Sequence, residues 1–290
     1  MASREFSITQ DVIDRMDPKD ERFGQVMTSL IQHLHNFIRD VQLTEAEWMA
    51  AIQFLTKTGQ ITTDRRQEFI LLSDTLGVSI LVDAINNRLP NGATEQTVLG
   101  PYYWEGAPRL PMGSDIAEGI KGEPCYFSGV VTSLDGKPIE GAEIDVWSGD
   151  GEGNYDMQLG TGMRCRAIFT TGKDGKYWFR SVKPYYYPVP DDGPVGDMLR
   201  AMGRHPNRPG HTHFILRAPG HKGIVTHLFP SDSPYLDTDT VFGVKDGLIV
   251  DFVRHEPGAA PTGEKVDQPF HTCEYNFQLA PLDAVEPKAA

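Results

Sequence analysis

The stretch Arg208-Pro-Gly-His-Thr-His-Phe-Ile-Leu-Arg-Ala-Pro-Gly220 decides how the second half of this chain is interpreted. It places His211 and His213 two positions apart in a run of residues typical of a β-strand. Successive side chains of a strand point to opposite faces, so positions i and i+2 share a face. Two imidazoles on one face can bind the same metal ion, although most histidine pairs with this spacing are ordinary surface or core residues. The stretch therefore predicts a strand and indicates a candidate metal site.

Short runs of β-branched and aromatic residues surround this stretch from Gly100 onward, separated by turns rich in Gly and Pro. An Asp135-Gly136 step, for example, is a turn signal between two of the runs. Seven short strands with frequent turns are typical of an antiparallel sandwich. The predicted strands cover residues 125–133, 142–147, 176–182, 211–217, 224–229, 247–253 and 275–279.

The first third of the chain has a helical pattern instead. Apolar residues recur at three-and-four spacing over 21–41, which predicts an amphipathic helix. Thr44 and Glu47 match a capping box that begins a second helix ending near residue 55. Two further helices are predicted over 64–76 and 78–87. The chain is therefore expected to be an α+β protein, with a helical domain over 1–105 and a β-sandwich domain over 106–290.

Composition excludes several classes of protein. The 290-residue chain has a formal net charge of −13, which argues against nucleic acid as a partner, because phosphate binding needs clustered Lys and Arg. No signal peptide and no run of eighteen apolar residues is visible, so no membrane span is expected. Cys125, Cys165 and Cys273 are too scattered for a disulfide framework. These features predict a cytoplasmic protein.

Two histidines do not complete a metal site, so the remaining ligands must be found. No Asp or Glu follows His213 closely, and the usual set of two histidines and one carboxylate for Fe(II) lacks its nearby third member. Tyrosines stand out instead, at Tyr155 and in the run 185–187 that opens a long loop over 183–208. A phenol has a pKa of about 10, and a hard trivalent ion can displace its proton. Two phenolates and two neutral imidazoles would leave Fe(III) with a net charge near +1.

Four segments together resemble the intradiol ring-cleavage dioxygenases, the family of catechol and hydroxyquinol 1,2-dioxygenases. They are TVLGPYYWEGAP (97–108), GAEIDVWSGDGEGNYD (141–156), FRSVKPYYYPVPDDGPVGDML (179–199) and RPGHTHFILRAPGHKGIVTHLF (208–229). The stretches DTLGVSILVDAIN (74–86) and PDDGPVGDMLRAMGRHP (190–206) make the hydroxyquinol branch the most similar. The resemblance spans roughly residues 74–229, and the helical N-terminus also suits this family.

The resemblance implies that Tyr155, Tyr187, His211 and His213 bind a non-haem Fe(III). Tyr187 is preferred for its spacing to the following Pro-Val-Pro-Asp-Asp-Gly turn, with Tyr186 as the alternative. In the family, one tyrosine leaves the metal when substrate binds and takes a phenolic proton. Here that tyrosine would be Tyr187.

Further roles follow from the same resemblance. Arg208 is expected to stabilise negative charge that develops on the substrate, and its alternative is an ion pair with Asp191 or Asp192. His227 stands where catechol-cleaving relatives have a glutamine, and we expect it to hydrogen-bond near the metal.

The substrate pocket is expected to lie between the helices and their link to the sandwich. Ile80 and Asp83 share one helix face, and Gly100, Pro101 and Tyr102 form the link. Hydroxyquinol carries a third hydroxyl group, and the Asp83 carboxylate could accept its hydrogen bond. The alternative for Asp83 is a charge on the helix surface.

The resemblance implies cleavage of hydroxyquinol (1,2,4-trihydroxybenzene) by O₂ to maleylacetate, that is, 3-hydroxy-cis,cis-muconate. Within the class, the alternative is cleavage of catechol or substituted (chloro)catechols to cis,cis-muconates. Outside it, the alternative is a metal-free β-sandwich binding module. The long apolar stripe of the first predicted helix also predicts a homodimer through the helical domain, in which the family can hold a phospholipid.

Overall fold

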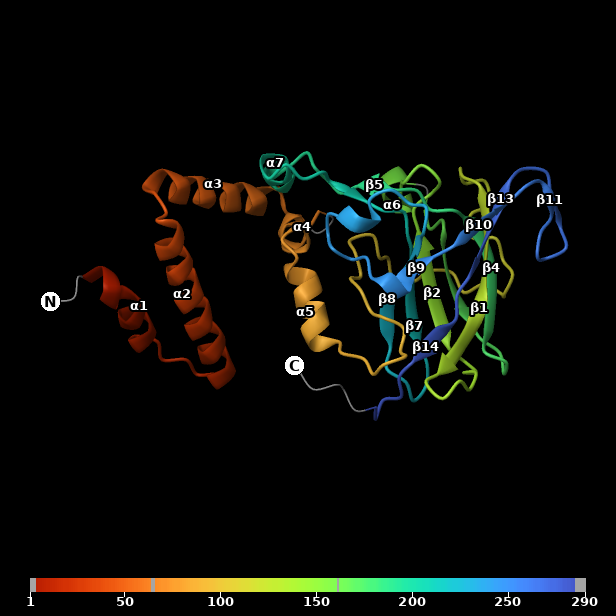
Figure 1. Cartoon of the computed structure of the whole chain (residues 1–290), viewed down its shortest axis with the longest axis horizontal. Helices are drawn as coiled ribbons and strands as arrows, with labels where there is room; N and C mark the ends of the chain where they lie inside the picture. The colour runs from red at the N-terminus through yellow and green to blue at the C-terminus, as the bar shows by residue number, and fades with distance from the viewer. Residues whose placement is uncertain (1–3, 64–65, 161, 285–290) are drawn as a thin grey trace. The chain divides into compact units, whose positions relative to one another are not determined.

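The computed structural model describes residues 4–63, 66–160 and 162–284, and three helices come first (Figure 1). They are α1 (Arg4–Asp14), α2 (Glu21–Val41) and α3 (Glu45–Ile61). The predicted capping box is confirmed: the backbone N–H of Thr44 donates to Glu47 Oε2 over 2.9 Å, and the N–H of Glu47 donates to Thr44 Oγ1 over 3.3 Å. The helix that it begins extends to Ile61, beyond its predicted end near residue 55.

Helix α2 leaves its apolar stripe uncovered. The chain divides into two compact units, Met1–Gln60 and Ile61–Ala290, and α2 belongs to the first. None of its residues is buried, and Phe23 and Leu30 are 59% and 54% exposed. Within the described part of the chain, no helix is long and apolar enough to cross a membrane.

The second unit begins with α4 (Glu68–Thr75) and α5 (Val78–Asn86), joined by Gly77 in the left-handed conformation at φ 73°. Their sequence positions confirm the two further predicted helices, although residues 64 and 65 lie outside the described part. Two shorter helices follow among the strands, α6 (Asp156–Leu159) and α7 (Pro194–Ala201), and neither was predicted. Short 3₁₀ turns occupy η1 (Leu236–Thr238) and η2 (Asp246–Leu248).

Two five-stranded sheets form the rest of the unit, which confirms the α+β class. One runs in the order β10-β13-β1-β14, with β4 also paired to β1, and the other in the order β3-β2-β7-β8-β9. Their strands are β1 (Pro124–Ser133), β2 (Glu143–Ser148), β3 (Arg166–Thr170), β4 (Lys176–Val182), β7 (Thr212–Arg217), β8 (Ile224–Pro230), β9 (Ile249–Val250), β10 (Phe252–His255), β13 (Phe270–Glu274) and β14 (Phe277–Leu279). Two-residue strands make two small ribbons, β5 (Tyr187–Pro188) with β6 (Asn207–Arg208) and β11 (Gly258–Ala259) with β12 (Lys265–Val266).

The sheets depart from a purely antiparallel arrangement at three pairs. Strand β1 pairs in parallel with β13 and with β14, and β8 pairs in parallel with β9. The predicted strand over 247–253 is divided into η2, β9 and β10. Strands β3 and β13 were not predicted, because RAIFT and FHTCE are short and carry polar residues.

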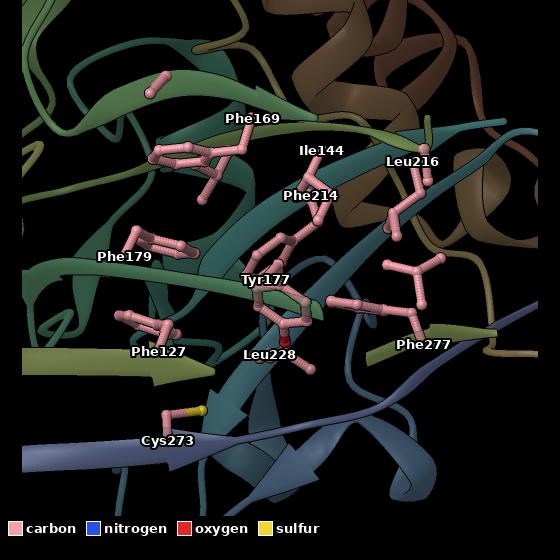
Figure 2. Close-up of a cluster of buried hydrophobic side chains, with 14 of the residues drawn as sticks. Phe127, Ile144, Phe169, Tyr177, Phe179, Phe214, Leu216, Leu228, Cys273 and Phe277 are labelled. Atoms are coloured by element: carbon pink, nitrogen blue, oxygen red, sulfur yellow. The ribbon is translucent and has the colours of Figure 1, made fainter. Parts of the chain in front are cut away.

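Aromatic side chains from both sheets meet in the core of the sandwich (Figure 2). Phe127 of β1 and Phe179 of β4 stack with centroids 4.8 Å apart. Phe179 also stacks on Phe169 of β3, which belongs to the other sheet, at 5.2 Å. Phe214 and Leu216 of β7 enter the same core. Because side chains alternate along a strand, His213 and Ile215 must face away from the core, on the outer face of the sheet.

Candidate metal centre and active site

One row of four residues crosses the outer face of the second sheet. In the registers of the paired strands, Arg166 of β3 lies opposite Trp147 of β2, Trp147 opposite His213 of β7, and His213 opposite His227 of β8. Residues directly opposite one another on paired strands share a face. All four are buried, with at most 2% of their surface exposed. The sheet therefore places a guanidinium, an indole and two imidazoles side by side.

His211, His213 and Tyr155 point their donor atoms at one place. The Nε2 atoms of the two histidines lie 3.1 Å apart. The Tyr155 oxygen lies 2.9 Å from His213 Nε2 and 3.5 Å from His211 Nε2. Strand β7 begins at Thr212, so His211, which the sequence predicted within the strand, lies one residue before it. The two imidazoles nevertheless meet, and a tyrosine from a separate loop joins them.

Tyr187 enters the same cluster. Its ring lies 5.3 Å from that of Tyr155 and 5.6 Å from that of His211, and the residue is 5% exposed. Tyr186 turns elsewhere, because its ring packs on Tyr185 at 4.4 Å and on Tyr235 at 5.2 Å. Of the two tyrosines left open by the sequence, Tyr187 lies beside the histidines.

Close backbone approach brings the two tyrosine segments together. Gly153 has a φ of 86°, and a Cβ atom there would lie 2.6 Å from the carbonyl oxygen of Tyr186. Gly100 also has a positive φ, 79°, and a Cβ atom there would lie 3.2 Å from Cε1 of His213. Both backbone conformations favour glycine, and at Gly153 a side chain would also collide with the backbone of Tyr186, whereas at Gly100 it would press on His213. The link residue Gly100, predicted to line the substrate pocket, thus lies against His213.

The histidines are held neutral. Burial lowers the pKa of His211 to about 3, and the nearby positive charge of Arg208 acts in the same direction. Burial also lowers the pKa of His213 well below its ordinary value. The phenol of Tyr155 is raised in pKa, first by burial and then by the neighbouring Tyr187. Without a cation, the site therefore favours neutral imidazoles and a protonated Tyr155 phenol.

The donor atoms fit a metal ion. His211 Nδ1 lies 2.8 Å from the carbonyl oxygen of Pro209, so Nδ1 carries the hydrogen of the neutral ring and Nε2 presents a lone pair. The Nε2 atoms of His211 and His213 and the Tyr155 oxygen lie 2.9 to 3.5 Å from one another. Donor atoms bound to one metal at about 2.1 Å lie about 3 Å apart when the bonds are at right angles. A cation at their centre would also replace the phenol proton.

His227 adds a third imidazole. Suitable nitrogens of His211, His213 and His227 all lie within 4.8 Å of one another. The rings of His227 and His211 stack at 4.6 Å, and neither nitrogen of His227 has a hydrogen-bond partner of good geometry among the described residues. Burial lowers the pKa of His227 well below its ordinary value, and a backbone contact with Val98 acts in the opposite direction. His227 is therefore a neutral imidazole that adds a third nitrogen donor to the cluster.

Arg208 is held by a carboxylate that the sequence did not indicate. Its Nε and Nη2 donate to Asp239 over 3.0 and 3.2 Å, and both side chains are buried. Burial opposes ionisation of Asp239, but the charge of Arg208 keeps the pKa of this carboxyl below its ordinary value. The alternative partners proposed for Arg208 are engaged elsewhere, Asp191 with Arg200 and Asp192 with Arg66.

The remaining nitrogen of Arg208 faces the cluster. Its Nη1 lies 3.4 Å from the Tyr187 oxygen and 3.2 Å from His211 Nε2. Strand β6 sets this position, because Arg208 lies directly opposite Tyr187 in the β5–β6 ribbon. The guanidinium can therefore donate a hydrogen bond to an anion bound in the cluster.

A cavity of about 870 Å³ adjoins the cluster through Tyr102, although Tyr155, Tyr187, His211 and His213 do not line it. Tyr102 lines it and stacks on Tyr155, with centroids 4.4 Å apart and planes 21° apart. Pro101, Leu71 and Asp74 also line it. Burial raises the pKa of Asp74, and the charges of Arg208 and Asp239 reach its carboxylate. Among the predicted pocket residues, Pro101 and Tyr102 thus lie in the cavity wall.

Ile80 and Asp83 are not among the residues that line this cavity. The Asp83 carboxylate accepts hydrogen bonds from Asn87 and Gln96, and Lys245 Nζ lies 3.7 Å from it. Asp74, in contrast, lines the cavity, as do Glu68 and Asp156. Asp74 and Asp83 are both acidic residues in apolar helical runs, so this sequence pattern does not distinguish them.

Comparisons with known proteins agree with this geometry. The family model described as "Catechol dioxygenase N terminus" matches residues 20–94, and the model described as "Dioxygenase" matches residues 98–281. A cluster of histidine and tyrosine donors within such a domain implies a non-haem iron.

Individual relatives are similar over most of their length. A 6-chlorohydroxyquinol 1,2-dioxygenase of Cupriavidus pinatubonensis is 50% identical over 87% of this chain and 92% of its own. A hydroxyquinol 1,2-dioxygenase of a Rhizobium species is 51% identical over 85% of each chain. The solved structure of hydroxyquinol 1,2-dioxygenase from Pseudomonas putida superposes with a TM-score of 0.90 at 43% identity, covering 96% of this chain and 98% of that one. With its two tyrosine-bearing loops and its histidine strand, the chain belongs to the intradiol ring-cleavage dioxygenases.

Proposed function

We propose that this chain cleaves hydroxyquinol between two adjacent hydroxyl-bearing carbons. Both atoms of O₂ would enter the product, 3-hydroxy-cis,cis-muconate, a tautomer of maleylacetate. The observation that carries the proposal is the convergence of His211, His213 and Tyr155. Tyr102 stacks on Tyr155 and lines a cavity whose wall also includes the partly buried carboxylate of Asp74. Relatives that are 50% and 51% identical to this chain are named for hydroxyquinols.

The proposed ligands are Tyr155, Tyr187, His211 and His213, and the proposed metal is Fe(III). Phenolates are hard, anionic donors, so they favour a trivalent over a divalent iron. When bound, the metal supplies a Lewis-acidic centre that two adjacent phenolic oxygens can chelate and that opens the ring to O₂. Burial keeps the imidazoles of His211 and His213 neutral, so the proposed ligands would leave the centre enough positive charge to bind a dianionic substrate.

The surrounding side chains would move protons and hold charge. Tyr187 would accept a substrate proton, and its oxygen lies within reach of Arg208 Nη1, 3.4 Å away. Arg208 can donate to the substrate anion, and Asp239 prevents it from turning away. His227 is a neutral imidazole beside the two proposed histidine ligands and can hydrogen-bond to an oxygen of solvent or substrate in the cluster.

Asp74 is the carboxylate placed to recognise the third hydroxyl group. It lines the cavity, whereas Asp83, the residue expected from the sequence, is occupied by Asn87, Gln96 and Lys245. A hydroxyl group that donates to this partly buried carboxylate would stabilise the complex in addition to the hydrogen bond from Ser79, and a substrate without it would leave one acceptor position of Asp74 unfilled. Such a loss costs about 1–3 kcal/mol, which corresponds to a ten- to hundredfold preference.

Chlorinated hydroxyquinols are a second candidate substrate class. The similarity to a 6-chlorohydroxyquinol 1,2-dioxygenase favours them. Catechol and chlorocatechols, which lack the third hydroxyl group, are expected to be poorer substrates.

Oxygen uptake tests the proposal. Hydroxyquinol, 6-chlorohydroxyquinol, catechol and 4-chlorocatechol are compared at equal concentration with protein loaded with iron. Faster uptake with either hydroxyquinol than with catechol is expected, and the reverse order would reject the proposed substrate. A colourless protein that retains no iron after expression with added iron would support a metal-free binding module instead.

We also propose a homodimer through the first unit. The exposed apolar stripe of α2 supports it, because a stripe of this length is rarely left to water. Sedimentation is expected to give the mass of a dimer, and Leu30→Glu with Leu34→Glu to give a monomer. A wild-type monomer would reject the dimer. Extraction of a phospholipid from the purified protein would support lipid at the helices, and its absence would reject the lipid.

The proposed compartment is the cytoplasm. Cys125, Cys165 and Cys273 are all buried and free. Free thiols are the usual state in reducing compartments.

A further inference from the structure

Arg166 is a buried charge at one end of the row that carries His213. It lies opposite Trp147, which in turn lies opposite His213, and it is 2% exposed. A guanidinium is rarely buried unless a carboxylate and further acceptors surround it. Neither the sequence motifs nor the proposed mechanism gives this residue a role.

All three nitrogens of the Arg166 guanidinium have hydrogen-bond partners. Arg166 Nε donates to Asp156 Oδ2 over 2.6 Å, and its Nη2 binds the other oxygen of the same carboxylate. Asp156 also accepts from the backbone N–H groups of Met157, over 2.8 Å, and Arg164, over 3.0 Å. Both Nη atoms of Arg166 then donate to the carbonyl oxygen of Tyr102 over 3.3 Å. The bidentate pair is therefore rigid and leaves no net charge.

Both partners of the guanidinium adjoin Tyr155. Asp156 is the next residue in the chain, and Tyr102 is the residue whose ring stacks on Tyr155 at 4.4 Å. One side chain thus binds the backbone of the stacking partner and the side chain of the chain neighbour. Among the described residues, Arg166 makes no hydrogen bond to the Tyr155 oxygen, so it acts on this phenol only through Asp156 and Tyr102.

We propose that Arg166 is a positioning residue that fixes the stack of Tyr102 on Tyr155 and so directs the Tyr155 oxygen toward His213. This rests on the proposed function, in which Tyr155 binds the metal. The same contact holds the segment of Tyr102 that lines the substrate cavity. Arg166 therefore couples the geometry of the metal ligand to the wall of the pocket.

The test uses Arg166→Lys and Arg166→Gln in the full-length protein loaded with iron. Lysine keeps the charge but cannot bridge Asp156 and Tyr102 in a planar fork. We expect a shifted tyrosinate-to-iron absorption band in both variants. KM for hydroxyquinol should rise about tenfold, at the lower end of the roughly 10- to 100-fold losses of metal affinity or activity that follow when residues orienting metal ligands are changed. Arg180→Lys is the matched control, because Arg180 forms a partly exposed ion pair with Asp115 at 3.3 Å on another strand. This control should leave the band and KM unchanged.

A second variant keeps the proposal testable if the Arg166 variants do not fold. Tyr102→Leu removes the stack and leaves the ion pair in place, and it should shift the same band. A wild-type band and KM in folded Arg166→Lys would overturn the proposal, and so would a wild-type band in Tyr102→Leu. Failure of the proposed function is distinct from both, because it appears in the wild-type protein as a lack of colour or of oxygen uptake.

Discussion

The indole of Trp147 stacks on the imidazole of His213, with ring centroids 4.5 Å apart and planes inclined by 11°. Trp147 is fully buried, and its Nε1 has no hydrogen-bond partner among the described residues, so it serves the site by shape alone. Trp147→Ala is expected to lower the free energy of unfolding by about 3–5 kcal/mol, because it leaves a cavity under the histidine. Trp147→Phe should cost less, since an aromatic ring remains. Urea unfolding measures both, and a loss under about 1 kcal/mol in the alanine variant would contradict the packing role.

Asp239→Asn is expected to be strongly destabilising. It leaves Arg208 as a buried charge without its counter-ion, which costs about 3–5 kcal/mol. Asp191→Asn is the control, because Asp191 and Arg200 form an exposed pair worth about 0–1 kcal/mol. Urea unfolding and kcat/KM are measured for both variants. Equal behaviour of the two would show that Asp239 does not hold Arg208 in place.

Tyrosine variants test the proposed ligands by colour. Tyr155→Phe and Tyr187→Phe should each weaken or shift the visible tyrosinate-to-iron band, and the double variant should lose it. Tyr186→Phe is the matched control, because its ring packs on Tyr235 away from the histidines. A band that persists in the double variant, or that disappears with Tyr186→Phe, would show that the assignment of the tyrosines is wrong.

Acid is expected to destabilise the iron-free protein. Burial lowers the pKa of His211 from 6.5 to about 3, so the unfolded chain binds a proton that the folded chain does not. The folded state therefore incurs no free-energy penalty for His211 above pH 6.5, and the free energy of unfolding decreases as pH falls from 6.5 toward 3. His213 and His227 act in the same direction, and each contributes at most about 1.4 kcal/mol per pH unit. Urea unfolding between pH 7 and 5 measures the slope, which His227→Gln should reduce; a stability independent of pH would contradict neutral burial.

Two carboxylates can be compared for their effect on substrate choice. Asp74→Asn should lower the ratio of kcat/KM for hydroxyquinol to that for catechol by about ten- to hundredfold, because Asp74 lines the cavity. Asp83→Asn should leave this ratio near the wild-type value, since its partners are Asn87, Gln96 and Lys245. A ratio that responds to Asp83 and not to Asp74 would restore the assignment expected from the sequence.

The sequence predicted the parts of the fold that depend on local periodicity. The stripe over α2 and the capping box of Thr44 each determine a helix without help from the rest of the chain. The alternation in β7 likewise separates His213 from Phe214. Strand β3 was missed, because its β character comes from pairing with β2, which no local pattern reveals.

Residues that act by tertiary pairing could not be found from the sequence. Asp239 lies 31 positions from Arg208, and nothing near either residue links them. Asp156 follows Tyr155 directly, yet its partner Arg166 is indistinguishable in the sequence from a surface arginine. The choice between Asp74 and Asp83 also depended on which face of each helix the cavity adjoins.

The register of β7 determines both which of its side chains enter the hydrophobic core and which face the candidate metal centre. Phe214 and Leu216 enter the core only if His213 faces the opposite side of the sheet. A one-residue slip of this strand would exchange the two faces, placing the imidazole of His213 in the sandwich and the phenyl ring of Phe214 at the candidate metal site. Core packing therefore also fixes the position of the ligand strand. A deletion within β7 is expected to unfold the domain and not only to abolish activity.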